Sequence, residues 1–330
     1  MTDIRPDSRS AASSPAGTTT KPRPPGEARR PPSTGPLPRR RAKAPFAPWV
    51  LMSPALTVLI GMTIAPAIYL VYSSLRNEQL LTGGGGFVGL NNYKDVLTDP
   101  TMRHSFWVTL AFVAAAVLIE TVLGLLLAVP LAEQTRANNV GATLLLLPFA
   151  ITPAVSGLVF RQLLNPNYGW VNYYLGKLGL PAGIDWFANS GSAWVAVIGL
   201  DVWQWTPFVA LILIAGLQSL PREPVEAAAV DGASRWQTFR YITLPQLTPF
   251  IAIAVVLRTI QAFKTFDTFK ILTGGGPGNS TEIINLGIYR VALQSFRVGA
   301  AAAMGILFLI ILSLLVPVLL RVVGRSTEEV

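Results

Sequence analysis

The sequence predicts an all-α membrane protein that crosses the bilayer six times. Of its 330 residues, 51% are hydrophobic and only 13% are charged, which is about half the charged fraction of an ordinary soluble domain. The mean hydropathy is +0.48. Six apolar runs are long enough to cross about 30 Å of hydrocarbon at about 1.5 Å per residue. They cover roughly residues 49–72, 107–132, 140–160, 194–217, 250–268 and 299–320.

The first 47 residues are rich in Pro, Ser, Thr, Gly and Arg and have little to bury, so we expect a disordered tail. A basic cluster, Arg39, Arg40, Arg41 and Lys43, directly precedes the first span. Because cytoplasmic flanks carry an excess of Lys and Arg, this cluster predicts a cytoplasmic N-terminus. Six crossings would return the C-terminus, with a short tail at 326–330, to the same side.

The third span contains two prolines. Pro148 and Pro153 should break or kink the helix over residues 140–160. A bilayer tolerates such a break only where the freed carbonyls face protein or water. Two interpretations stay open, a kinked helix that lines a pathway and plain helix packing.

Two further regions differ from ordinary spans. The connector 161–192 is polar and rich in aromatic residues, with the run NPNYGWVNYY, and should include a short surface helix. The fifth span, which should start near Phe250, is short and is interrupted by Arg258 and Lys264.

Charge and composition exclude several function classes. The net charge of +9 arises largely from the tail, since ten of the 26 Lys and Arg residues precede residue 44, and we predict no nucleic-acid binding. There is no cysteine, and His104 is the single histidine, so we expect no catalytic residue and no metal site. The run GGGPGNST from Gly274 lacks the G-K-[ST] ending of a phosphate loop.

The polar stretch 221–249 has the marks of a folded docking element between two spans. Pro224 suits the first turn of a helix, and Gly232 suits a left-handed helix end. Ser234 and Gln237 have the spacing of a capping box, which begins a second helix that Pro245 should stop. Three alanines, Ala227 to Ala229, would allow close approach by another protein.

This stretch resembles the EAA loop of inner-membrane permease subunits of binding-protein-dependent ABC importers. It matches the pattern E-A-A, three residues, G, nine residues, I, one residue, L-P, from Glu226 to Pro245. The resemblance implies a type I importer permease domain over residues 48–325, whose loop is a cytoplasmic coupling helix that inserts into an ATPase subunit. The docking residues would be Glu226, Ala227, Ala228, Asp231, Gly232, Leu244 and Pro245. An ordinary amphipathic connector between spans is the alternative.

Two other segments resemble the carbohydrate-transporting branch of this family. They are the F-x-G-L-x-N-Y form at Phe87 to Tyr93 and the Gly-rich region from Phe266 to Leu293. The resemblance implies a multi-pass subunit in the cell membrane that imports a sugar by alternating access. It implies a second permease, in a heterodimer, two ATPase subunits and an extracytoplasmic sugar-binding protein. This chain would hold no cofactor, and ATP and Mg would be bound by the ATPase partners.

Polar residues inside the spans are the candidate sugar-cavity residues, because each is costly in hydrocarbon unless it is paired or hydrated. Those in the fourth span, which share a helical face with Phe208, are Asp201, Gln204 and Trp205, and those in the fifth are Arg258, Gln261 and Thr265. Planar polar groups and aromatic rings suit a sugar. The alternative is that Asp201 and Arg258 pair with each other as a structural contact.

Glu120 in the second span is the remaining acidic residue at membrane depth, and we expect a buried structural role for it. An ion-coupled secondary transporter that uses Glu120 and Asp201 is the alternative function. It would require inverted repeats, and we find no internal repeat in the sequence.

Overall fold

Every regular element in the computed structural model is helical, and the model describes residues 47–181 and 183–328. The prediction of a disordered tail over residues 1–47 therefore falls, apart from Ala47, outside the described residues. The elements are α1 (Ala47–Ser74), α2 (Asn91–Thr98), α3 (Pro100–Leu131), α4 (Arg136–Leu145), α5 (Leu147–Ala150), α6 (Pro153–Leu163), α7 (Trp170–Lys177), α8 (Ser190–Ser219), α9 (Glu223–Val230), α10 (Arg235–Thr238), the π-helix η1 (Phe239–Thr243), α11 (Leu244–Phe263), α12 (Asp267–Leu272), α13 (Ile284–Tyr289), the π-helix η2 (Arg290–Gln294) and α14 (Val298–Glu328). The prediction of an all-α fold is confirmed.

Five helices are long and apolar enough to cross a membrane, and a broken helix supplies a sixth candidate span. The five are Val50–Ser74, Pro100–Leu131, Ser190–Ser219, Arg235–Phe263 and Val298–Val318. The sixth consists of Arg136–Ala150 and Pro153–Leu163, with a bend of 90° between them.

The break lies where the two prolines predicted it. Pro148 stands in the first turn of α5, and Pro153 in the first turn of α6. Thr152 is extended, with φ −66° and ψ 142°, because the ring of a proline disfavours the helical conformation of the residue before it.

The fifth span differs from the prediction at both ends. Pro245 does not stop a short helix, because the chain stays helical from Arg235 to Phe263. The π-helix η1 precedes Pro245, and the Leu244 N–H bonds to the Phe239 carbonyl, five residues back. This wider turn relieves the clash that a proline causes in a regular helix. The span ends at Phe263, where residue 268 was expected.

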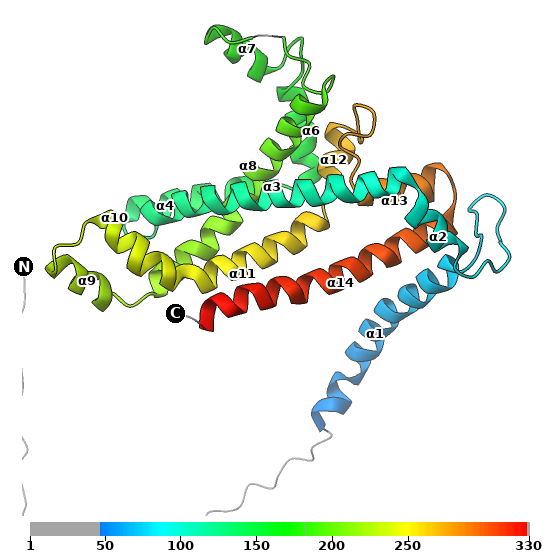
Figure 1. Cartoon of the computed structure of the whole chain (residues 1–330), viewed down its shortest axis with the longest axis horizontal. Helices are drawn as coiled ribbons and strands as arrows, with labels where there is room; N and C mark the ends of the chain where they lie inside the picture. The colour runs from blue at the N-terminus through cyan, green and yellow to red at the C-terminus, as the bar shows by residue number, and fades with distance from the viewer. Residues whose placement is uncertain (1–46, 182, 329–330) are drawn as a thin grey trace, which may run out of the picture. The chain divides into compact units, whose positions relative to one another are not determined.

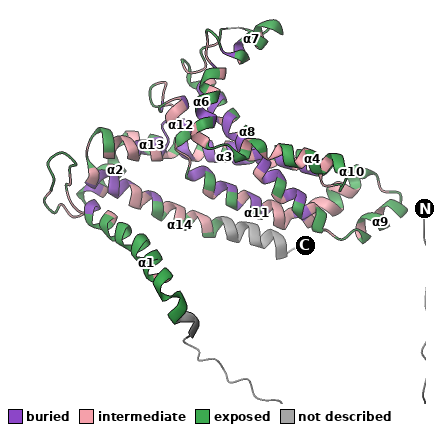
Figure 2. Ribbon diagram, turned by 180° about the vertical axis from the view of Figure 1, so that it is seen from behind, coloured by how far each residue is buried: buried purple, intermediate pink, exposed green. Residues whose placement is uncertain are grey.

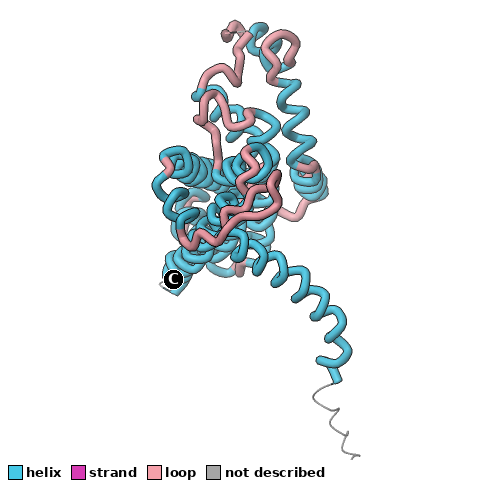
Figure 3. Tube along the Cα trace, turned by 90° about the vertical axis from the view of Figure 1, so that its right-hand side faces the viewer, coloured by secondary structure: helices cyan, strands magenta, loops and turns pink. Residues whose placement is uncertain are grey.

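The described chain forms two parts, which divide between Val58 and Leu59. In the second part α3, α8, α11 and α14 run side by side (Figures 1 and 3). Small residues let these helices approach closely. At Gly124 of α3 an added Cβ would lie 2.8 Å from Val209 of α8, and at Gly216 of α8 it would lie 2.6 Å from the Phe250 ring.

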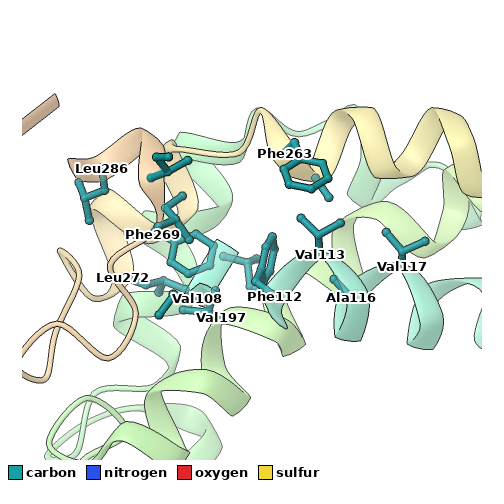
Figure 4. Packing of buried hydrophobic residues seen from close by; sticks show 14 of the residues in the cluster. Val108, Phe112, Val113, Ala116, Val117, Val197, Phe263, Phe269, Leu272 and Leu286 are labelled. Carbon is teal, nitrogen blue, oxygen red and sulfur yellow. The ribbon is translucent and has the colours of Figure 1, made fainter. Parts of the chain in front are cut away.

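A hydrophobic cluster fills one end of this bundle (Figure 4). The rings of Phe112 and Phe269 meet edge to face, with their centroids 4.7 Å apart. Figure 2 shows the buried residues along α3, α8 and α11, whereas large apolar side chains are exposed on the outer faces of α3 and α14. Apolar outer faces are what a surrounding bilayer requires.

Candidate coupling loop and transmembrane polar cluster

The candidate coupling loop contains the first short helix that the sequence predicted, α9, but its second helix is the start of the 29-residue helix Arg235–Phe263. Pro224 lies in the first turn of α9, and the helix ends at Gly232 in the left-handed region, with φ +81°. The Ala233 N–H then bonds to the Ala228 carbonyl at 2.9 Å, which closes the helix end. The capping box is confirmed, because the Ser234 and Gln237 side chains each accept from the other residue's backbone N–H.

The predicted docking residues occupy two places. Those on α9 and in the turn after it are exposed or partly exposed, namely Glu226, Ala227, Ala228, Asp231 and Gly232. Leu244 and Pro245 are partly buried and begin α11. Acidic residues in the first turn of α9, Glu223 and Glu226, favour the helix because they complement its dipole.

A cleft of about 680 Å³ separates α9 from the ends of α3 and α8. Glu133 from beyond α3 and Arg222 and Glu226 from the loop line it, together with Arg235 at the start of α10. Helix α9 packs mainly on α10 and η1. Helix α9 follows α8 after three residues and precedes the helix that begins at Arg235, so it is linked to the bundle at both ends.

At membrane depth, Arg258 of α11 lies between two carboxylates from neighbouring helices. Its Nε donates to Glu120 Oε2 at 2.5 Å and one Nη donates to Glu120 Oε1 at 2.9 Å. The same nitrogen donates to Asp201 Oδ2 of α8. All three side chains are at most 1% exposed. The cluster thus connects α3, α8 and α11, and each charge has the partner that burial in a membrane demands.

The structure thus brings Asp201 and Arg258 together in an ion cluster, the arrangement that the sequence left as the alternative to a sugar cavity. The Glu120 side chain has the buried position that was expected, and it supplies two of the contacts to Arg258. Sequence reasoning did not assign Glu120 to Arg258. An acidic residue in an otherwise apolar helix was the available signal.

The other four candidate cavity residues have different surroundings. Gln204 is buried and donates to the Ile151 carbonyl, at the break between α5 and α6, at 2.6 Å. Trp205 is half-buried, with the Arg258 guanidinium carbon 4.8 Å from its ring centre. Gln261 is exposed and Thr265 is half-buried.

Three aromatic rings gather beside the break. Phe149 of α5 lies 5.4 Å from Trp205 and 5.5 Å from Phe208, between ring centroids. Sequence analysis did not select Phe149, although its position directly after Pro148 is a signal that the ring stands at a helix break. The break, the ring cluster and the ion cluster are therefore adjacent.

The Gly-rich segment after α12 is tied to several helices. The Trp194 Nε1–H of α8 donates to the Ser280 carbonyl at 3.0 Å, and His104 Nε2 of α3 lies 3.1 Å from the Asn279 carbonyl. Arg290 forms an ion pair with Glu282 and donates to the Gly274 carbonyl at 3.0 Å. The contacts of Trp194 and His104 lie near the start of α8 and of α3. The candidate coupling loop lies at the other end of these two helices.

Comparisons with known proteins agree with this architecture. The family model described as "Binding-protein-dependent transport system inner membrane component" matches residues 105–329. A probable ABC transporter permease protein, y4oQ of Sinorhizobium fredii, is 38% identical over 286 residues, which cover 86% of this chain and 92% of the relative. The trehalose/maltose transport system permease protein MalF of Thermococcus litoralis is 36% identical over 281 residues, 85% of this chain and 94% of the relative.

A solved structure shares the fold. It is a bacterial alginate ABC transporter in complex with an alginate pentasaccharide-bound periplasmic protein, matched with a TM-score of 0.73 at 24% identity over 85% of this chain and 96% of that one. The family match covers well over half of the chain. The chain therefore belongs to the binding-protein-dependent transport system inner membrane component family, and it is a multi-pass permease of the sugar-transporting ABC type.

Proposed function

We propose that this chain is the transmembrane subunit of an importer that moves a sugar into the cytoplasm, driven by ATP hydrolysis in separate subunits. The observation that carries the proposal is the continuous helix from the coupling loop to the buried ion cluster. Arg235 and Arg258 belong to the same 29-residue helix. At about 1.5 Å per residue they are about 35 Å apart, most of the thickness of a bilayer with its headgroups.

In this proposal an ATPase subunit grips α9 at its exposed residues, with Glu226 meeting a basic group of the ATPase. Movement of α9 displaces α10, η1 and α11 together, because no interruption separates them. Arg258 holds α3 and α8 to α11 by its ion pairs. The three helices then move as one body, and the pathway opens alternately to the two sides.

The sugar pathway would run along the aromatic cluster at the broken span. Trp205, Gln261 and Thr265 would contact the sugar, since they are at least partly exposed. Asp201, Gln204 and Arg258 would support them from behind, because their side chains are buried in internal contacts. Aromatic rings beside amide and hydroxyl groups suit the mixed apolar and polar surface of a sugar ring.

The proposed assembly contains a second permease, two ATPase subunits that bind ATP and Mg²⁺, and an extracytoplasmic sugar-binding protein. Both termini and the coupling loop would face the cytoplasm, in agreement with the basic cluster from Arg39 to Lys43. The family match and the loop motif support this arrangement.

The test compares two acidic residues on the same short helix. Glu226→Ala and Glu223→Ala each remove one exposed carboxylate from α9. In reconstituted complexes, Glu226→Ala should lower sugar uptake and binding-protein-stimulated ATPase activity about tenfold or more, the effect of losing one charge-assisted hydrogen bond. Glu223→Ala should retain both activities. Equal activity of the two variants would contradict the docking role of Glu226.

The same vesicles separate the proposal from an ion-coupled transporter that uses Glu120 and Asp201. Uptake that needs ATP and persists with an ionophore supports the proposal. Uptake that survives without ATP and collapses with the ionophore would overturn it.

A further inference from the structure

The connector between α6 and α8 presents an exposed group of aromatic side chains. Tyr168, Trp170, Tyr173 and Tyr174 are 54% to 67% exposed. Rings of this size usually bury much of their surface. A group of exposed rings on one surface therefore marks a site of interaction.

A rigid frame holds these rings. The buried Asn172 side chain donates to the Ile184 carbonyl at 2.9 Å and accepts from Trp186 Nε1 at 3.1 Å. The Asn165 side chain accepts the Asn167 N–H at 2.9 Å and so closes a tight turn. At Gly169 an added Cβ would lie 2.4 Å from two backbone oxygens, so the chain folds back on itself more closely than any other residue would permit.

The rings also support one another. Tyr173 and Tyr174 meet at 75° with centroids 5.3 Å apart, and Trp170 and Tyr174 meet at 67° with centroids 6.5 Å apart. The Tyr168 hydroxyl donates to Gln162 Oε1 at 2.9 Å. The rings are thus positioned before any ligand arrives, which lowers the entropy lost on binding.

These side chains line an open pocket of about 480 Å³, a volume within the usual range of about 300–1,000 Å³ for small-molecule sites. Its lining residues carry no charge, and they are Pro166, Asn167, Tyr168, Gly169, Trp170, Asn172, Tyr173, Tyr174 and Gly183. The Lys177 ammonium lies over the Tyr173 ring, 4.8 Å from its centre. The wall is therefore aromatic and amide in character.

We propose that this pocket binds a neutral saccharide outside the membrane, before the sugar enters the pathway. The inference rests on the proposed function and names the class of sugar. Aromatic faces match the C–H faces of a pyranose ring, and the Asn167 amide and the tyrosine hydroxyls match its hydroxyl groups. The Lys177 ammonium is held over the Tyr173 ring and is not part of the lining, so an acidic sugar would find no basic group in the lining itself.

The position of the pocket fits this role. The connector joins the start of α8, and the coupling loop follows the end of the same 30-residue helix. The two therefore lie at opposite ends of a span, so that a pocket on the connector faces the sugar source when the coupling loop faces the ATPase. A membrane-surface anchor would also use Trp and Tyr, but it would need neither a pocket nor the Asn172 and Gly169 frame.

The experiment uses the whole complex in nanodiscs, without the binding protein and with 5-fluorotryptophan in the permease. Trp170→Phe assigns the Trp170 fluorine resonance. Maltose and trehalose, as neutral probes, should shift this resonance saturably, whereas glucuronic acid should not. Tyr174→Ala should weaken the disaccharide affinity about tenfold, as expected for a lost ring contact.

Leu178→Ala is the matched control, because Leu178 is 75% exposed on the same connector and lies outside the pocket. It should leave the affinity unchanged. A silent Trp170 resonance, or equal affinity in Tyr174→Ala and the unaltered protein, would overturn the inference. Quenching of Trp170 by lipids brominated near the headgroup would overturn it as well, because it places the ring in the membrane surface.

Failure of this inference can be told from failure of the proposed function. If the unaltered complex imports maltose or trehalose while Trp170 gives no response, the pocket inference alone is wrong. If no saccharide is imported or stimulates ATP hydrolysis, the proposed function itself is wrong, whatever the pocket binds.

Discussion

Arg258 of α11 forms a buried two-point ion pair with Glu120 of α3, 138 residues away in the sequence. The guanidinium also pairs with Asp201, so a single cation serves two carboxylates from two other helices. Removing the cation would leave both acids buried without a partner, whereas removing all three charges would leave none unpaired. This asymmetry gives the first prediction.

Arg258→Met should destabilise the subunit by about 3–5 kcal/mol, the usual cost of breaking a buried pair. The measurement is thermal unfolding of the purified subunit, followed by tryptophan fluorescence. Lys264→Met, at the exposed residue that directly follows the same helix, should have little effect. The triple variant Glu120→Gln, Asp201→Asn, Arg258→Met should regain much of the lost stability. If Arg258→Met unfolds at the same temperature as the unaltered protein, the cluster does not hold the helices together.

Gly232 gives a prediction about the coupling loop. Its φ of +81° is strained for any residue that carries a side chain, although no atom lies within 4 Å of the position that a Cβ would take. Gly232→Val should therefore disturb the turn through the backbone alone, by about 1–2 kcal/mol, and reduce coupled uptake. Gly232→Asn should retain more activity, because Asn tolerates the left-handed conformation. Comparable uptake by the Val and Asn variants would argue against a role for this backbone conformation.

The close approach of α3 and α8 gives a third prediction. Gly124→Ala places a methyl group 2.8 Å from Val209 and should cost about 1–3 kcal/mol by overpacking. Val209→Ala in the same chain should recover most of that loss. Gly199→Ala on α8 has open space around it and serves as the control. Additive effects of the Gly124 and Val209 changes on the unfolding temperature would contradict direct contact.

Gln204 and Gln218 form a matched pair on α8. Each donates to a backbone carbonyl, Gln204 to Ile151 at 2.6 Å inside the protein and Gln218 to Ala132 at 3.3 Å on its surface. Gln204→Leu removes the partner of a partly buried carbonyl at the broken span and should cost about 1 kcal/mol or more. Gln218→Leu should be close to neutral in the same unfolding measurement. Unfolding of Gln204→Leu at the same temperature as the unaltered protein would show that the break does not depend on Gln204.

Orientation can be tested directly, because the chain has no cysteine. Single cysteines at Ser234 and Lys177 lie on exposed positions at opposite ends of α8. In intact cells or right-side-out vesicles, an impermeant thiol reagent should label Lys177→Cys and spare Ser234→Cys. The reverse pattern would place the coupling loop outside, where no cytoplasmic ATPase could reach it.

Much of the local structure could be predicted because its causes act over a few residues. The capping box at Ser234, the left-handed Gly232 and the break at Pro148 and Pro153 each follow from backbone geometry within about one helical turn. The prediction for Pro245 was wrong because a π turn upstream accommodates the ring. That choice depends on the path of the whole fifth span, which local rules do not contain.

The sequence by itself determined the membrane class, the six apolar runs and the family, because composition and short spacings carry them. Only the tertiary structure decided which charges meet. Arg258 could have faced a sugar or either acid, and the packing of α3, α8 and α11 selected Glu120 and Asp201. Helix faces that are apolar nearly all round do not specify their neighbours, so these pairings arise from the fit of small and large side chains between helices.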